Sequence, residues 1–223
     1  MSVDPSLAVW MYGSHARGDA DERSDLDLLA VAGSTHGVLP PLPIPVGTEP
    51  AVSRYSWNEI GRMADSGSLF LRHVSLEGRP VYEASDVQGS LSRLLSGLGP
   101  YRHASRDLQG FQKVVRDVRE SLESGSAPVA FELSTLATVF RHASILACNV
   151  AGRPCFSRLG PVSTVVDLWR LPPEWTAEFA TFYDFRMYAE GRATQPDNSS
   201  IRFARLWCDR TDALLTELGG RIA

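Results

Sequence analysis

The sequence is poor in lysine and cysteine. Lys113 is the one lysine among 22 basic residues, and the other 21 are arginine. The three cysteines, Cys148, Cys155 and Cys208, form no CxxC pair, which excludes a disulfide framework and a cysteine-rich zinc site. A net charge of −4 argues against an extended nucleic-acid-binding surface. We therefore expect a protein of a reducing compartment, the cytoplasm.

Long apolar runs are also absent. No run approaches the roughly 20 residues that a membrane-spanning helix needs. The first 19 residues have no basic segment ahead of their short apolar stretch, so we expect no signal peptide. These observations predict a protein without a membrane partner.

The two parts of the chain differ in pattern. Residues 1–99 alternate short apolar runs with clusters of Gly, Ser, Pro and Asp, whereas residues 100–223 show long helical periodicity. We therefore expect an α+β fold in two domains, 1–99 and 100–223. The second would be a helical bundle that binds an acceptor or forms a dimer.

In the first part, the apolar and turn residues predict three strands, two short helices and a further strand. The expected strands are 7–12, 25–32 and 51–56. Residues 39–50 contain five prolines and should form a stiff connection without helix. The remaining expectations are a helix over 57–67, an apolar stretch, turn and short strand over 68–83, and a helix over 86–98.

In the second part, the apolar periodicity predicts four long helices and one shorter helix. Most of them end at glycine, and the last is expected to end before Gly219 and Gly220. The expected helices are 102–124, 129–151, 161–169, 172–190 and 198–218.

One segment carries chemistry: Gly13-Ser14, ten residues, then Asp25-Leu26-Asp27. A strand that ends in Gly-Ser lets backbone amides and the hydroxyl converge on an anion, since glycine permits close approach. Alternation along a strand puts Asp25 and Asp27 on one face, where two carboxylates can hold a divalent cation such as Mg²⁺. A phosphate cradle beside such a site suits attack on a nucleoside triphosphate.

This pattern resembles the nucleotidyltransferase superfamily that includes DNA polymerase beta, and looks closest to the minimal nucleotidyltransferases and aminoglycoside adenylyltransferases. The resemblance covers residues 5–85 and implies a small mixed sheet with flanking helices. It also implies that Gly13, Ser14 and Arg17 bind the nucleotide and that Asp25 and Asp27 are catalytic ligands of Mg²⁺. Local pairing of Arg17 with Asp19 or Asp21 is the alternative for that side chain.

The sequence departs from the family at the third carboxylate, which usually stands on the next strand. Alignment puts that position near Ala51 or Ser53, and neither is acidic. Glu49 is a candidate third ligand or base, although Pro50 between it and the strand makes regular pairing doubtful.

The resemblance implies transfer of a nucleoside monophosphate, AMP from ATP, to a hydroxyl of an acceptor, with release of pyrophosphate. The acceptor could be a small molecule, a protein or tRNA, and the chain could form a homodimer. The alternative is a degenerate module of the same fold that binds nucleotide or a partner protein, for example in a toxin–antitoxin system.

Overall fold

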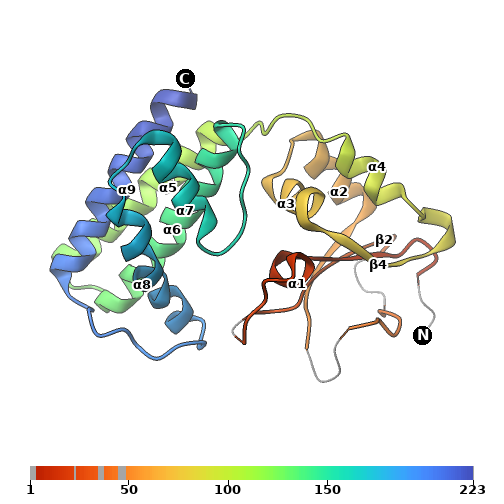
Figure 1. Cartoon of the computed structure of the whole chain (residues 1–223), viewed down its shortest axis with the longest axis horizontal. Coiled ribbons are helices and arrows are strands. Elements are labelled where there is room, and N and C mark those ends of the chain that lie inside the picture. Colours follow the sequence, from red (N-terminus) through yellow and green to blue (C-terminus); the bar gives the residue numbers. More distant parts are fainter. Residues whose placement is uncertain (1–3, 23, 35–37, 45–48, 223) are drawn as a thin grey trace. The chain divides into compact units, whose positions relative to one another are not determined.

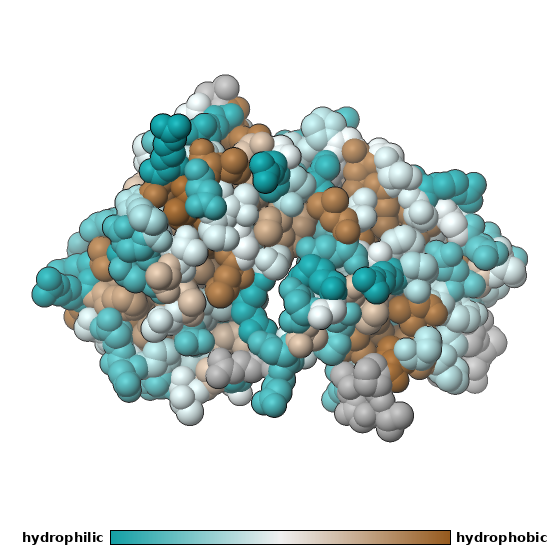
Figure 2. Space-filling model, viewed as in Figure 1, coloured by the Kyte–Doolittle hydropathy of each residue, from teal (hydrophilic) through white to brown (hydrophobic). Residues whose placement is uncertain are grey.

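A computed structural model describes residues 4–22, 24–34, 38–44 and 49–222 of the 223. The chain divides into two compact units, residues 1–102 and 103–223 (Figure 1). In the described residues of both units, no helix is long and apolar enough to cross a membrane. Figure 2 shows apolar side chains dispersed among polar ones on the visible face of each unit.

The first unit is built on a mixed four-stranded sheet with the order β3-β2-β1-β4. The strands are β1 (Ala8–Tyr12), β2 (Asp27–Ala32), β3 (Ala51–Ser56) and β4 (Arg79–Glu83). Strand β1 pairs with β2 and β4 in antiparallel fashion, and β2 pairs with β3 in parallel fashion. The mixed sheet and the strand over 51–56 confirm the prediction from the sequence.

The helices of this unit cover one face of the sheet. They are α1 (Gly13–Arg17), α2 (Trp57–Asp65), α3 (Leu69–Glu77) and α4 (Ser90–Ser96), with a 3₁₀ turn at Ser85–Val87. Because side chains alternate along a strand, Trp10 and Tyr12 share this face with Leu29. They pack on buried residues of α2, α3 and α4, among them Ile60, Leu71, Val74 and Leu91.

The opposite face of the sheet carries a second, smaller core. Val9, Leu28 and Ala30 are buried there, against partly buried apolar residues of the proline-rich connection, Leu39, Leu42 and Ile44. Residues 45–48 of that connection lie outside the described residues. The two central strands, β1 and β2, therefore bury both of their faces, which explains the near-continuous apolar run of β2.

Helix α3 differs from the expectation for residues 68–83. The sequence predicted an apolar stretch there, but Leu69–Glu77 is helical and only the strand after the turn matches. Leu71 and Val74, three residues apart, are both buried against the sheet. The run is short and apolar around most of its circumference, so its periodicity does not separate helix from strand.

The second unit contains only helices among its described residues. They are α5 (Ala104–Ser124), α6 (Val129–Val150), α7 (Gly160–Trp169), α8 (Glu174–Ala189) and α9 (Ile201–Ile222). Helix α6 packs against each of the other four and is the most buried. The predicted helical region is confirmed, with ends that differ by a few residues.

Helix α9 passes through the two glycines that were expected to end it. A Cβ at Gly219 would lie 3.4 Å from the Leu108 side chain, so the α9 backbone approaches α5 closely at this point. Packing of α9 on α5 overrides the weak helix propensity of glycine, which costs about 1 kcal/mol per residue. The prediction that the helix ends before Gly219 is wrong.

Candidate active site

The site begins where β1 passes directly into α1. Tyr12 ends the strand and Gly13 begins the helix with a φ of 74°. A Cβ at Gly13 would lie 2.8 Å from Oδ2 of Asp27. Glycine is required here for two reasons, the left-handed backbone and the carboxylate that lies against it.

The pairing of β1 with β2 brings the carboxylate to this junction. Asp27 is the first residue of β2 and stands opposite Tyr12 in the antiparallel ladder. Leu26 and Leu28 are fully buried, whereas Asp25 and Asp27 are partly exposed. The alternation predicted for this segment is present, although Asp25 lies two residues before the strand begins.

Ser14 closes the turn of α1 through its backbone. Its carbonyl oxygen accepts hydrogen bonds from the amides of Gly18 at 2.9 Å and Asp19 at 3.1 Å. Within the described part of the chain, no hydrogen bond forms to the Ser14 hydroxyl. The hydroxyl is therefore available to a ligand that approaches the Gly13 turn.

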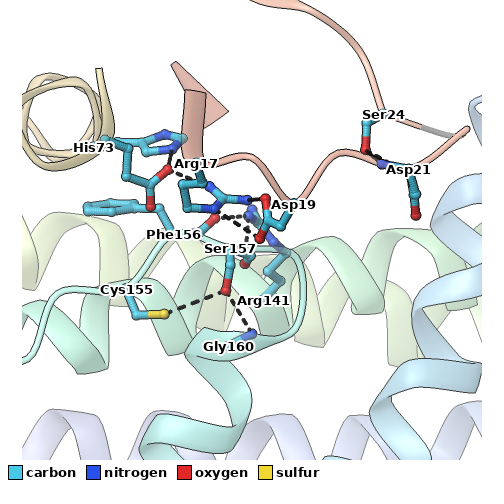
Figure 3. A network of polar contacts seen from close by, with 11 residues as sticks. Arg17, Asp19, Asp21, Ser24, His73, Arg141, Cys155, Phe156, Ser157 and Gly160 are labelled. Atoms are coloured by element: carbon cyan, nitrogen blue, oxygen red, sulfur yellow. Dashed lines mark hydrogen bonds and ion pairs between the residues drawn. The ribbon is translucent and has the colours of Figure 1, made fainter. Parts of the chain in front are cut away.

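Arg17 ends α1 and lies between two carboxylates (Figure 3). Its Nε donates to Oδ2 of Asp19 at 3.2 Å, its Nη2 forms an ion pair with Oδ1 of Asp19 at 3.1 Å, and its Nη1 donates to Oε2 of Glu77. The local pairing with Asp19 that the sequence allowed is present in the structure.

Glu77 joins Arg17 to helix α3. Its Oε2 also lies 2.8 Å from Nε2 of His73, whose ring packs edge-on against Tyr12 with a centroid separation of 5.3 Å. Burial would raise the pKa of Glu77, but hydrogen bonds and charges from His73 and Arg17 outweigh it and lower this pKa below its ordinary value. Neither Glu77 nor a role for His73 was predicted from the sequence, and the signal for them is their i,i+4 spacing on one helix.

A family model described as a nucleotidyltransferase domain matches residues 3–46. This stretch contains β1, α1 and β2, and so every residue of the Gly13-Ser14 and Asp25-x-Asp27 motif. The match supports the resemblance of this part of the first unit to the nucleotidyltransferase superfamily. No curated protein matches the chain significantly.

Two uncharged residues, Ala51 and Ser53, occupy the place where the resemblance implies a third carboxylate. In the parallel ladder Ala51 pairs with Asp27 and Ser53 with Leu29. The Ser53 hydroxyl lies 3.4 Å from the Tyr12 hydroxyl. Burial raises the pKa of Tyr12, and the negative charge of Asp27 adds to this, so the phenol is neutral at ordinary pH.

Glu49 lies outside the sheet. The ladder between β2 and β3 begins at Ala51, two residues after Glu49, and Pro50 stands between them. The Glu49 side chain is exposed. The structure therefore gives Glu49 no partner in the ladder between β2 and β3.

The donor set for a metal ion consists of two carboxylates. Within residues 4–22, 24–34, 38–44 and 49–222, no three or more His, Cys, Asp or Glu side chains gather closely enough to hold a metal. Mg²⁺ is commonly bound by one or two protein carboxylates, with substrate phosphates and water as the other ligands. Asp25 and Asp27, beside a turn that carries the Ser14 hydroxyl, fit such a shared ion.

We predict that Gly13→Ala is more destabilising than Gly18→Ala. Both glycines have positive φ, 74° and 84°, so both substitutions carry a backbone strain of about 1–2 kcal/mol. At Gly18 a Cβ would meet nothing within 4 Å, whereas at Gly13 it would overlap the Asp27 carboxylate. Urea unfolding should show a further loss of about 1–3 kcal/mol for Gly13→Ala. Equal losses would contradict the contact between Gly13 and Asp27.

We also predict a pH-dependent effect of Glu77→Gln. A carboxylate with a lowered pKa stabilises the fold above its unfolded pKa, ordinarily near 4.5, and this contribution is lost as pH falls through the folded pKa. The variant should be less stable than the wild type by about 1–3 kcal/mol at neutral pH. The difference should shrink as pH falls below about 4.5.

Urea midpoints across this pH range measure the Glu77 effect. Glu22→Gln removes an acid from an exposed position of the same unit and serves as the control. A stability difference for Glu77→Gln that stays constant with pH would show that the native ion pairs of Glu77 do not cause it.

Proposed function

We propose that the protein transfers a nucleoside monophosphate, AMP from ATP, to a hydroxyl of an acceptor and releases pyrophosphate. The observation that supports this most is the contact between Gly13 and Asp27. It brings an acidic side chain against the backbone of a turn whose Ser14 hydroxyl is available to a ligand. A phosphate group at that turn would lie directly beside the carboxylate.

In this proposal, the backbone of Gly13 and the hydroxyl of Ser14 bind the triphosphate. Glycine has no side chain to keep a ligand from its backbone, and a serine hydroxyl can donate to a phosphate oxygen. Arg17 binds the phosphates from the end of α1, where its planar guanidinium can donate two parallel hydrogen bonds.

Asp25 and Asp27 would hold Mg²⁺ together with the phosphates of the substrate. When bound, the ion supplies charge neutralisation at the phosphates and promotes loss of the acceptor hydroxyl proton. The carboxylates orient the α-phosphorus relative to the acceptor hydroxyl. The attacking oxygen forms a bond to that phosphorus and gives up its proton to water, and the bond to the pyrophosphate oxygen breaks.

We propose no protein base among the residues beside Asp27. The adjacent positions on β3 are Ala51 and Ser53, and Ser53 is within hydrogen-bonding distance of the neutral Tyr12. Glu49 is exposed and lies ahead of the ladder, and catalysis requires a carboxylate held within about 0.5 Å of its productive position.

The acceptor is a small molecule, a protein or tRNA, and the helical unit is our candidate for binding it or for forming a homodimer. We propose that the protein acts in the cytoplasm. Its three cysteines are free thiols, as expected in a reducing compartment, and ATP is present there.

A second candidate is a non-catalytic module that binds nucleotide or a partner protein. The observation that favours it is the pair of uncharged residues, Ala51 and Ser53, where a third carboxylate is expected. The intact Gly13, Ser14 and Asp27 cluster favours the enzyme instead. Consumption of ATP with Mg²⁺ separates the two candidates.

We predict that Asp27→Asn abolishes turnover and the dependence of ATP binding on Mg²⁺. Pyrophosphate release in the presence of cell extract measures turnover. Thermal stabilisation by ATP, with Mg²⁺ or with EDTA, measures binding, since a ligand stabilises the fold according to its affinity. The wild type should show a much larger stabilisation with Mg²⁺, and Asp27→Asn should show equal stabilisation in both.

Glu49→Gln is the matched control for the loss of a carboxylate. It should retain turnover within about twofold, whereas a role as base would cost at least about tenfold, or 1.4 kcal/mol in barrier. Such a loss in Glu49→Gln would identify Glu49 as the third acid. If wild-type protein releases no pyrophosphate with any nucleoside triphosphate or extract, the non-catalytic module replaces the enzyme.

A further inference from the structure

Arg17 has two carboxylate partners whose surroundings differ. The side chain of Glu77 is 13% exposed and that of Asp19 is 56% exposed. An exposed ion pair contributes little stability and is readily exchanged, whereas breaking a buried pair leaves an uncompensated charge.

Glu77 is the fixed partner. Its carboxylate contacts both the guanidinium of Arg17 and Nε2 of His73, and His73 in turn packs against Tyr12. Helices α1 and α3 pack against each other, so the pair crosses an established contact of the fold. Glu77 therefore anchors the end of the Arg17 side chain without occupying its exposed edge.

Asp19 is the exchangeable partner. Its Oδ2 accepts a hydrogen bond from Nε of Arg17 and its Oδ1 lies 3.1 Å from Nη2, so it contacts the guanidinium at two points, as a phosphate group can. The Asp19 amide donates to the carbonyl oxygen of Ser14, so its backbone is fixed to the turn that begins with Gly13. The Asp19 carboxylate thus covers the edge of Arg17 in the same turn as the Ser14 hydroxyl.

We propose that Asp19 is a place-holder for phosphate on Arg17: a terminal phosphate of the nucleotide displaces the Asp19 carboxylate, while Glu77 keeps the guanidinium in position. The proposal rests on the proposed function, because it takes Arg17 as a phosphate ligand. It makes Asp19 a determinant of nucleotide affinity and Glu77 a positioning residue. Without Asp19, the guanidinium edge would be open to phosphate from the start.

Binding of inorganic tripolyphosphate in EDTA, followed by calorimetry on the full chain, tests this exchange without metal, nucleobase or turnover. Asp19→Asn should bind at least about threefold more tightly than the wild type, a modest gain because the pair that is lost is exposed. Glu22→Gln, which removes an exposed acid three residues away in the same loop, should change the affinity much less.

Glu77→Gln separates exchange from general electrostatics. Both Asp19→Asn and Glu77→Gln remove one negative charge next to Arg17, so simple charge repulsion predicts tighter binding for both. The proposal predicts opposite signs, with weaker binding for Glu77→Gln because Arg17 loses its anchor. Urea unfolding of each variant checks that it is folded at the temperature of the measurement.

Arg17→Gln distinguishes failure of this inference from failure of the phosphate role of Arg17. Tripolyphosphate affinity that falls in Arg17→Gln and rises in Asp19→Asn supports the exchange. If affinity falls in Arg17→Gln but Asp19→Asn binds no more tightly than Glu22→Gln, the exchange is wrong and the phosphate role stands. If Arg17→Gln leaves the affinity unchanged, Arg17 is not a phosphate ligand and both are overturned.

Discussion

The close packing of the Asp27 carboxylate on the backbone of Gly13 is the contact on which the candidate site depends. It requires the antiparallel pair of Tyr12 with Asp27, a left-handed glycine and a helix that begins without a linker. A shift of one residue in the ladder would turn Asp27 to the other face of the sheet and bury it among leucines. The buried residues on both faces of β2 fix that register, so the two cores hold the acid in place.

A second group of contacts positions the end of α1. This helix has five residues, too few to be stable alone, and it depends on the C-terminal hydrogen bonds to Ser14 and on its packing against α3. The ion pair of Arg17 with the largely buried Glu77 contributes to this packing. The residues that we propose for phosphate binding thus stand on the short helix α1, which packs against β1 and α3.

Much of this arrangement could be predicted from the sequence, because it is local. Gly13-Ser14 and Asp25-x-Asp27 are separated by ten residues, and the strand alternation that exposes the acids is visible in the letters DLDL. The contribution of Glu77 could not be predicted in the same way. It lies 60 residues from Arg17 in the sequence, and their contact depends on how α3 crosses α1.

The predictions that the structure contradicts also failed because they depend on tertiary contacts. Leu69–Glu77 is too short and too apolar for periodicity to identify it as a helix, and its class is set by packing on the sheet. In the sequence, Gly219 indicates a helix end. Its close approach to Leu108 inside α9 is a tertiary contact, which the sequence does not show. The residue type at the third-acid position was evident from the sequence. The hydrogen-bonding distance between Ser53 and Tyr12 was not evident, since it depends on the order β3-β2-β1 in the sheet.

The proposed reaction transfers a nucleoside monophosphate, which is the α-phosphoryl group together with its nucleoside, to an acceptor. Parallel incubations of the protein with Mg²⁺, cell extract and ATP labelled at either the α- or the γ-phosphorus test it most directly. Our account predicts that α-label becomes attached to a small molecule, protein or RNA, while γ-label leaves only as pyrophosphate. Attachment of the γ-label to an acceptor, or no attachment of α-label from any nucleoside triphosphate that the protein binds, would contradict it.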